Sequence, residues 1–184
     1  YFKNYQMSNK KKYILITGGL GFIGSAIVKK LIKKKFFIIN IDSLNYASNK
    51  KNLEDVEKLS NYKFLRIDIS NKKKLKKIFI KYKPAYVINC AAETHVDRSI
   101  LNSKKFITTN IIGTYNLLQC VKETISVNKN FKLFHQVSTD EVFGDSLNTK
   151  IAPKENSPYI PSSPYSASKA SADHLVMAWG RTYN

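Results

Sequence analysis

The chain has 184 residues, 43% of them hydrophobic, with 10 Phe and 11 Tyr, a composition that favours a folded domain and excludes a disordered chain. A formal net charge of +18 would suit nucleic-acid binding. However, the excess lies in residues 1–83, which hold 21 basic and 5 acidic residues. Helix-like segments carry these lysines without interleaved aromatic residues, so we expect solvated helix surfaces and no nucleic-acid partner.

Targeting and redox signals are sparse. Cys90 and Cys120 make no disulfide framework and predict reduced packing residues in a cytoplasmic protein. No apolar run approaches the ~18 residues that span a membrane, so we expect no membrane association. Residues 1–12 are interpreted as a basic tail, because the apolar run that follows meets Gly18 and Gly19 too early for a signal peptide.

From residue 13 onward, short apolar runs alternate with amphipathic segments. This alternation predicts a Rossmann-like, doubly wound α/β fold, with a parallel sheet and helices on both faces. In chain order, the expected strands are 13–17, 36–41, 62–67, 85–90 and 131–138. The expected helices lie near 22–34, 50–60, 71–82 and 100–127, with a last helix from Pro164 toward Tyr183. We expect residues 13–184 to form a dinucleotide-binding domain that lacks its last strand or strands.

The first strand runs into the glycine-rich stretch "TGGLGFIG". Gly18, Gly21 and Gly24 let the backbone turn sharply and approach a pyrophosphate, whose charge helix N-terminal amides can meet. Asp42 ends the second strand, 18 residues after Gly24. Its carboxylate can accept hydrogen bonds from a ribose and would repel a 2′-phosphate, which favours NAD over NADP. The alternative is a tight structural turn and an ordinary strand-end acid.

Two further strand ends fit a dinucleotide site. Asp68 in "LRIDIS" is placed at the end of the third strand, where it could reach an adenine amino group, although an N-cap for the next helix explains it nearly as well. Ala91 and Ala92 follow the fourth strand in "NCAAETHVDRSI". Their small side chains would let the dinucleotide backbone lie close.

Tyr165 and Lys169 lie four residues apart at the start of the last expected helix, on one face. A tyrosine becomes a useful base only when its pKa falls, and a nearby ammonium can lower it. Tyr46 and Lys50 repeat the spacing. We interpret that second pair as a chance match, because it follows the second strand and is expected far from a nicotinamide.

The fifth strand leads into "VSTDEVFGD", which places Thr139, Asp140 and Glu141 at its end. Adjacent carboxyl groups suit general acid–base chemistry, in which one is ionised and the other protonated. The alternative is a polar strand end with an aspartate cap.

The stretches "TGGLGFIG", "AAETHVDRSI", "VSTDEVFGD" and "SPYSASKASADHLV" resemble the extended short-chain dehydrogenase/reductase family, and within it the dTDP-glucose 4,6-dehydratases. The resemblance covers nearly the whole chain from Tyr13 and implies a lyase with tightly bound NAD. It implies oxidation of C4 of the sugar by Tyr165, loss of water across C5 and C6 by Glu141 and Asp140, and hydride return to C6. Thr139 would hydrogen-bond the C4 oxygen, and Lys169 would also hold the nicotinamide ribose.

The same resemblance implies the remaining contacts. Thr94 would touch the nucleotide-sugar substrate, and no metal is expected. The NAD site would comprise Gly18, Gly21, Phe22, Ile23, Gly24, Asp42, Asp68, Ile69, Ala91, Ala92, Thr109, Tyr165 and Lys169. A homodimer is implied for the full-length protein, together with a C-terminal substrate domain that this sequence lacks. Two alternatives remain open: another NAD-dependent dehydratase or epimerase acting on a UDP- or GDP-sugar, and a non-catalytic NAD-binding protein.

Overall fold

A five-stranded sheet with the order β3-β2-β1-β4-β5 forms the centre of the protein. The computed structural model describes residues 12–125, 127–145 and 152–183, so the expected basic tail lies outside it except for Lys12. All four strand pairs are parallel, which confirms the predicted doubly wound topology. The strands are β1 (Tyr13–Thr17), β2 (Phe37–Asp42), β3 (Tyr62–Arg66), β4 (Tyr86–Asn89) and β5 (Leu133–Gln136).

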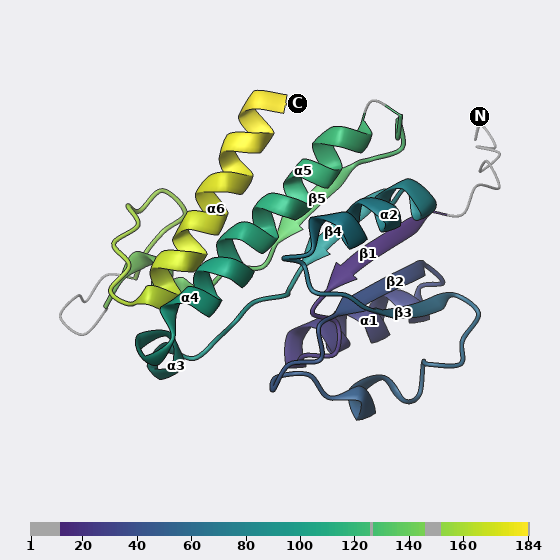
Figure 1. The fold of residues 1–184 in the computed structure, drawn as a ribbon, viewed down its shortest axis with the longest axis horizontal. Helices are drawn as coiled ribbons and strands as arrows, with labels where there is room; N and C mark the ends of the chain where they lie inside the picture. Colours follow the sequence, from purple (N-terminus) through teal and green to yellow (C-terminus); the bar gives the residue numbers. More distant parts are fainter. Residues whose placement is uncertain (1–11, 126, 146–151, 184) are drawn as a thin grey trace, which may run out of the picture.

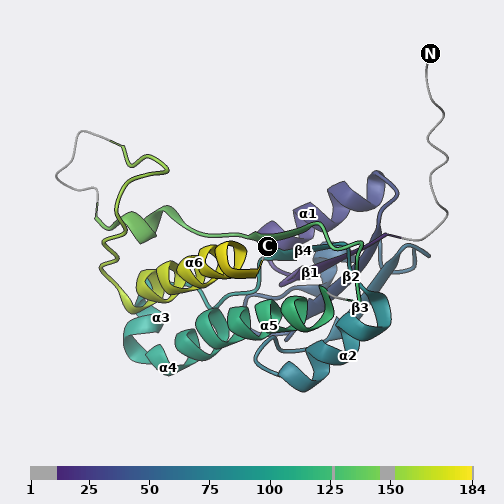
Figure 2. The same ribbon diagram turned by 90° about the horizontal axis from the view of Figure 1, so that it is seen from above.

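Helices cover both faces of this sheet (Figures 1 and 2). The helix α1 (Phe22–Lys33) lies on one face, and α2 (Lys72–Tyr82) and α5 (Thr114–Ile125) lie on the other. The last helix, α6 (Pro164–Tyr183), runs beside α5. Among the described residues, no helix is both long and apolar enough to cross a lipid bilayer.

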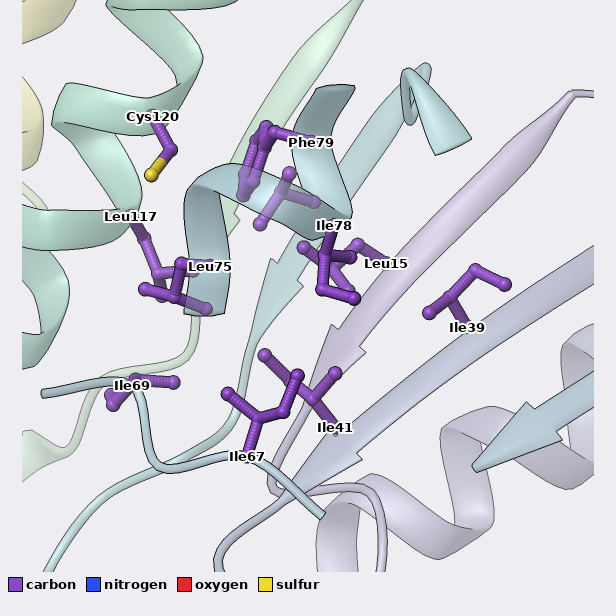
Figure 3. Packing of buried hydrophobic residues seen from close by; sticks show 11 residues of the cluster. Leu15, Ile39, Ile41, Ile67, Ile69, Leu75, Ile78, Phe79, Leu117 and Cys120 are labelled. Atoms are coloured by element: carbon purple, nitrogen blue, oxygen red, sulfur yellow. The ribbon is translucent and has the colours of Figure 1, made fainter. Parts of the chain in front are cut away.

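Each face of the sheet has its own hydrophobic core. The α2 side buries Leu75, Ile78 and Phe79 against strand residues such as Leu15 and Ile41 (Figure 3). This arrangement confirms the apolar face expected for the lysine-rich segment 71–82, because the three residues recur at helical spacing. The opposite core contains Val28 and Ile32 of α1 with Ile14, Ile16 and Ile38.

The helix expected at 50–60 is wrong. Only a short 3₁₀ turn, η1 (Lys50–Leu53), forms there, with the Asn49 side chain accepting a hydrogen bond from the Lys51 amide. Leu53 and Val56 are the buried positions of this stretch. Forming the first turn of a helix is unfavourable, so a helix must be stabilised by packing. Two buried side chains do not supply enough packing for a full helix.

The single helix expected at 100–127 is also wrong. The chain forms α3 (Val96–Leu101) and α4 (Ser103–Phe106), then a π-helical segment η2 (Ile107–Gly113) before α5. Asn102 breaks the helix with an extended backbone, φ −147° and ψ 70°. The π-helical segment carries Asn110, whose amide side chain binds the backbone of Glu93 through both its oxygen and its nitrogen. This tertiary contact favours the wider helix geometry over a regular one.

Candidate active site at the carboxyl ends of the strands

A cavity of about 590 Å³ opens at the carboxyl ends of the central strands, a size typical of ligand and cofactor sites. In a doubly wound sheet this edge, where the strand order reverses between β1 and β4, is the usual place for a ligand. Twelve residues singled out from the sequence line it: Gly18, Gly21, Phe22, Ile23, Gly24, Asp42, Asp68, Ile69, Ala91, Ala92, Thr94 and Thr109. Tyr165 and Lys169 are not among the residues that line the cavity.

The glycine loop forms the floor of this cavity. Gly18 has φ +67°, and a Cβ there would lie 2.7 Å from the amide nitrogen of Ala91. A Cβ on Gly24 would lie 2.2 Å from the Gly18 carbonyl oxygen. Glycine is therefore required at both positions, by backbone geometry at the first and by close approach at both. Gly21 begins α1 without a side-chain cap, so the first helical amides are available to an anionic ligand.

Asp42 ties the glycine loop to the end of β2. Its side chain, in a residue only 5% exposed, accepts hydrogen bonds from the amides of Leu20 at 3.0 Å and Leu44 at 2.9 Å. The hydroxyl of Ser48 donates a third bond at 2.6 Å. A carboxylate has about four lone-pair sites, so capacity remains for one ligand hydroxyl at the cavity wall.

Asp68 lies two residues after the end of β3 rather than on its last residue, which corrects its predicted place. Its carboxylate accepts the amide of Ser70 at 2.8 Å in a local turn. The N-cap of α2 is Asn71, which accepts the Lys74 amide at 3.0 Å. The capping explanation for Asp68 is therefore wrong, and its exposed side chain stands at the cavity.

The residues that follow β5 are fixed against one face of α6. Lys169 donates from Nζ to the Val137 carbonyl at 2.6 Å. The Ser138 hydroxyl donates to the carboxylate of Asp173. The Thr139 hydroxyl makes a hydrogen bond with the phenol of Tyr165. Three consecutive residues thus contact three side chains spaced one helical turn apart, which brings the two sequence-predicted catalytic segments together.

Thr139 also begins the short 3₁₀ turn η3 (Asp140–Phe143), where its hydroxyl accepts the Glu141 amide at 3.3 Å. Asp140 and Glu141 occupy the first turn and are exposed. Both lie close enough to Tyr165 for their charges to act on its phenol. The structure therefore gathers Thr139, Asp140, Glu141 and Tyr165 at one place.

The expected lowering of the pKa of Tyr165 is not met in this structure. Burial raises the pKa of Tyr165, the Thr139 hydrogen bond lowers it, and the carboxylates of Glu141 and Asp140 raise it again. Lys169 directs its ammonium at the Val137 carbonyl, and burial lowers the pKa of that ammonium. The sequence spacing placed Tyr165 and Lys169 on one helix face but carried no information about where the ammonium points.

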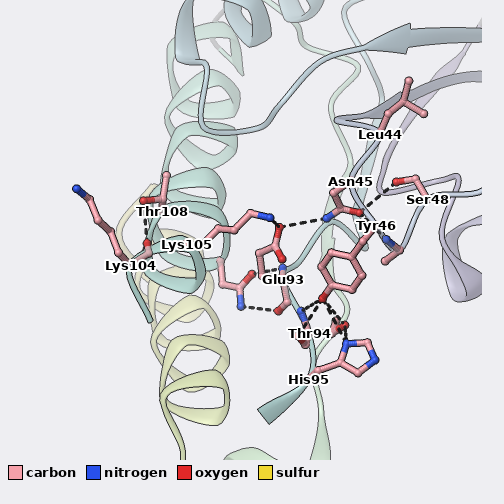
Figure 4. A network of polar contacts seen from close by, with 12 residues as sticks. Leu44, Asn45, Tyr46, Ser48, Glu93, Thr94, His95, Lys104, Lys105 and Thr108 are labelled. Atoms are coloured by element: carbon pink, nitrogen blue, oxygen red, sulfur yellow. Dashed lines mark hydrogen bonds and ion pairs between the residues drawn. The ribbon is translucent and has the colours of Figure 1, made fainter. Parts of the chain in front are cut away.

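Tyr46 belongs to the site, contrary to the expectation that it lies far away. It lies close enough to Tyr165 to contribute to the raised pKa of that residue, and its hydroxyl donates to the Thr94 carbonyl at 3.0 Å (Figure 4). The guanidinium of Arg98 lies 3.8 Å from the centre of the Tyr46 ring, within the range of a cation–π contact. The topology could have revealed this, because loops that follow parallel strands converge on one edge of the sheet.

Glu93 was not singled out from the sequence, although it lies within "AAETHVDRSI". It is 3% exposed, pairs with Lys105 at 3.0 Å and accepts from Asn45 at 3.1 Å (Figure 4). Glu93 and Lys105 line both the main cavity and a second hollow of about 230 Å³. Phe106, which also lines the second hollow, lies 6.2 Å from the Tyr165 ring centre. The second hollow therefore shares Glu93 and Lys105 with the main cavity, and one of its lining residues, Phe106, packs against Tyr165.

A comparison with protein-family models decides the family. Residues 15–184 match the model described as GDP-mannose 4,6 dehydratase. The chain belongs to this family. The match spans the glycine loop and the segment around Glu93, which line the cavity, and also the residues that follow β5 and helix α6.

Individual relatives give a more specific comparison than the family model does. The chain is 50% identical over 175 residues to a dTDP-glucose 4,6-dehydratase of Haemophilus influenzae, covering 92% of this chain and 52% of that protein. It is 47% identical over 178 residues to the Neisseria gonorrhoeae enzyme of the same name, covering 94% and 51%. The chain thus spans about half the length of the curated relatives it matches.

Solved structures give the same picture for the family fold. A dTDP-glucose 4,6-dehydratase from Streptomyces venezuelae, crystallised with NAD, superposes with a TM-score of 0.84 at 37% identity, covering 93% of this chain and 52% of that one. A Thermus thermophilus UDP-glucose 4-epimerase with NAD gives a TM-score of 0.81 at 27% identity, covering 93% and 51%. Among the described residues of this family member, no group of three His, Cys, Asp or Glu side chains is placed to hold a metal.

Proposed function

We propose that this chain is the NAD-binding part of a dTDP-glucose 4,6-dehydratase, which converts dTDP-glucose to the 4-keto-6-deoxy sugar nucleotide. One observation carries the proposal. Thr139, Asp140 and Glu141 lie beside Tyr165, and the segment that leads into them contributes Val137 to the lining of the glycine-loop cavity. This arrangement joins a site for a hydride carrier to an acid–base pair, which oxidation followed by elimination of water requires.

The cavity fits NAD by its own geometry. A Cβ at Gly18 or Gly24 would collide with neighbouring backbone, so glycine at both positions lets the loop fold tightly at the start of α1, where a pyrophosphate would lie. The uncapped start of α1 would meet the phosphate charge, and Asp42 retains room for a ribose hydroxyl. NAD, when bound, would supply the hydride acceptor for C4 and the hydride donor for C6.

The side chains would divide the proton transfers among them. Tyr165 would take the proton of the C4 hydroxyl, with Thr139 holding the same oxygen. Once C4 is a ketone, the neighbouring C5 proton is acidic, and Glu141 would remove it. Asp140, protonated, would give a proton to the C6 hydroxyl, which leaves as water. One proton leaves C5 and one joins the leaving hydroxyl, so the elimination removes one molecule of water. When hydride returns to C6, C5 would receive a proton again, from the Glu141 that removed it.

Two further proposals concern assembly and location. We infer a homodimer for the full-length protein, joined through α5 and α6, because Tyr115 of α5 and Met177 and Tyr183 of α6 are exposed, as is Ile112 of the preceding segment η2. Leu117 and Leu118 of α5 are buried within the chain, so they do not contribute exposed surface to such an interface. Free Cys90 and Cys120 support a reducing compartment such as the cytoplasm.

The decisive experiment uses the full-length protein, incubated separately with dTDP-glucose, UDP-glucose and GDP-mannose. Mass spectrometry would follow the loss of one water, with Glu141→Gln as the inactive variant and Glu54→Gln, an exposed acid beyond the cavity lining, as the matched control. We expect water loss from dTDP-glucose only, abolished in Glu141→Gln and retained in Glu54→Gln. Water loss from another sugar nucleotide would reassign the substrate, and NAD binding without water loss would reject the dehydratase.

A further inference from the structure

Asp173 is a buried acid that the proposed reaction does not use. It lies on α6, is 8% exposed, and follows Tyr165 and Lys169 at successive steps of four residues. Residues spaced in this way share one helix face. Its Oδ2 accepts hydrogen bonds from the Ser138 hydroxyl and, at 3.3 Å, from the Tyr159 hydroxyl. Its Oδ1 is buried without a hydrogen-bond partner among the described residues.

A carboxylate in this environment destabilises the folded protein, because burying a carboxylate with an unsatisfied oxygen opposes folding. Serine and tyrosine hydroxyls could be held equally well by a neutral acceptor. The charge itself therefore needs an explanation. Lys169, one turn earlier on the same face, is a buried ammonium whose charge Asp173 favours.

Asp173 also fixes the segment that leads to the acid–base pair. Ser138 directly precedes Thr139, and Val137 before it is held by Lys169. Tyr159 packs edge-on against Phe143 of η3 at 5.2 Å, so the second hydrogen bond to Asp173 supports the other end of that turn. One carboxylate thus contacts both sides of the segment that carries Asp140 and Glu141.

We propose that Asp173 is a positioning residue, which anchors the segment 137–143 to α6 and sets the surroundings of Lys169, one turn earlier on the same helix face. The proposal rests on the dehydration proposed above, since it assigns these contacts to that reaction. Asp173 touches neither substrate nor cofactor in this role. It acts through Ser138, Tyr159 and Lys169.

Several titratable groups surround Lys169, Tyr165 and Asp173, and a test must separate the effect of Asp173 from the effects of the others. Lys169 is influenced by Asp173 on its own helix and by Cys90 after β4. Tyr165 is influenced by Glu141 and Asp140 of η3 and by Tyr46 of the loop after β2. Asp173 itself contacts Tyr159 and Ser138. Removing the Asp173 charge should therefore act on Lys169 directly, and it should reach Tyr165 only through the segment 137–143, because Asp173 is not among the groups whose charge acts on Tyr165.

The test compares Asp173→Asn, Ser138→Ala and the control Ser171→Ala in the full-length protein with NAD. Ser171 is also on α6, but its hydroxyl bonds the Ala167 carbonyl of its own helix. In Asp173→Asn we expect kcat to fall about tenfold or more with little change in KM. The basic limb of the pH–rate profile should move about one unit toward lower pH, because Lys169 loses its proton more easily. Ser138→Ala should lower kcat without moving that limb, and Ser171→Ala should match wild type.

A measurement that does not depend on activity can test the role of Asp173 even if the proposed function is wrong. The Lys169 titration can be followed by NMR of protein labelled with [6-¹³C]lysine, with Lys169→Arg identifying the signal. A lowered Lys169 pKa in Asp173→Asn supports the charge role even if wild-type protein fails to dehydrate dTDP-glucose. An unchanged titration overturns it, as does a loss of kcat that only follows a loss of thermal stability.

Discussion

Gly24 and Gly180 offer the sharpest test of the glycine-loop geometry, because the same substitution should change stability in opposite directions. Both are helical, in α1 and α6. Alanine is more favourable than glycine in a helix by about 1 kcal/mol. A Cβ at Gly180 meets no atom within 4 Å. Gly180→Ala should therefore raise the free energy of unfolding by up to about 1 kcal/mol.

At Gly24 the added methyl group would lie 2.2 Å from the Gly18 carbonyl oxygen and 2.8 Å from the Gly19 Cα. Both neighbours are backbone of the loop that lines the cavity, so they move only if the loop deforms. Overpacking of this kind costs about 1–3 kcal/mol or more, which exceeds the gain in helix propensity. We expect Gly24→Ala to lower the free energy of unfolding by about 1–2 kcal/mol and to weaken NAD binding.

Urea denaturation followed by circular dichroism measures the stabilities, and titration calorimetry measures NAD affinity. Gly113→Ala provides an intermediate case, because its Cβ would lie 2.5 Å from a side-chain carbon of the buried Ile69 and not from backbone. The expected order of stability is Gly180→Ala, wild type, Gly113→Ala, Gly24→Ala. If Gly24→Ala were as stable as Gly180→Ala, or bound NAD like wild type, the close approach to Gly18 would not shape the site.

Three further outcomes follow from buried groups. Asn89 is buried and donates to Thr114 at 3.2 Å and Gln136 at 2.8 Å, so Asn89→Leu should cost about 1–3 kcal/mol in urea denaturation, since their oxygens lose a donor. Burial raises the pKa of Cys90 to about 11. The rate at which iodoacetamide alkylates Cys90, measured by mass spectrometry, should therefore increase about tenfold per pH unit up to that value. A rate that does not change with pH would contradict the burial. Because burial also raises the pKa of Tyr165, the rate of C4 oxidation should increase with pH above neutrality in stopped-flow absorbance; a rate that falls there would exclude Tyr165 as the base.

Local patterns predicted those parts of the fold that local physics determines. The apolar spacing of Leu75, Ile78 and Phe79 was enough to place α2 and its buried face. The glycine loop was equally readable, because few other sequences satisfy a strand, a sharp turn and a helix start in succession. The parallel sheet with helices on both faces followed from the alternation of strands and helices along the chain.

Features that depend on contacts between distant residues were not predictable in this way. The break at Asn102 and the π-helical segment accompany the bonds between Asn110 and Glu93, which lie 17 residues apart. Tyr46 joins the site only because the loop after β2 folds over toward Thr94. Lys169 satisfies the Val137 carbonyl, 32 residues away. The spacing of residues within one helix cannot predict these partners, because it describes each segment alone.

The distribution of charge shows why composition was a poor guide to function here. Of the 31 basic residues, many are exposed lysines on helices such as α2, where Lys73, Lys74 and Lys77 face solvent. The 13 acids are scarce, yet several lie at or beside the cavity, and Asp42, Glu93 and Asp173 among them are buried. Each of these three is held by hydrogen bonds from neighbouring elements. The net charge of +18 therefore describes the helix surfaces, whereas the chemistry of the site is set by the few carboxylates that the fold positions.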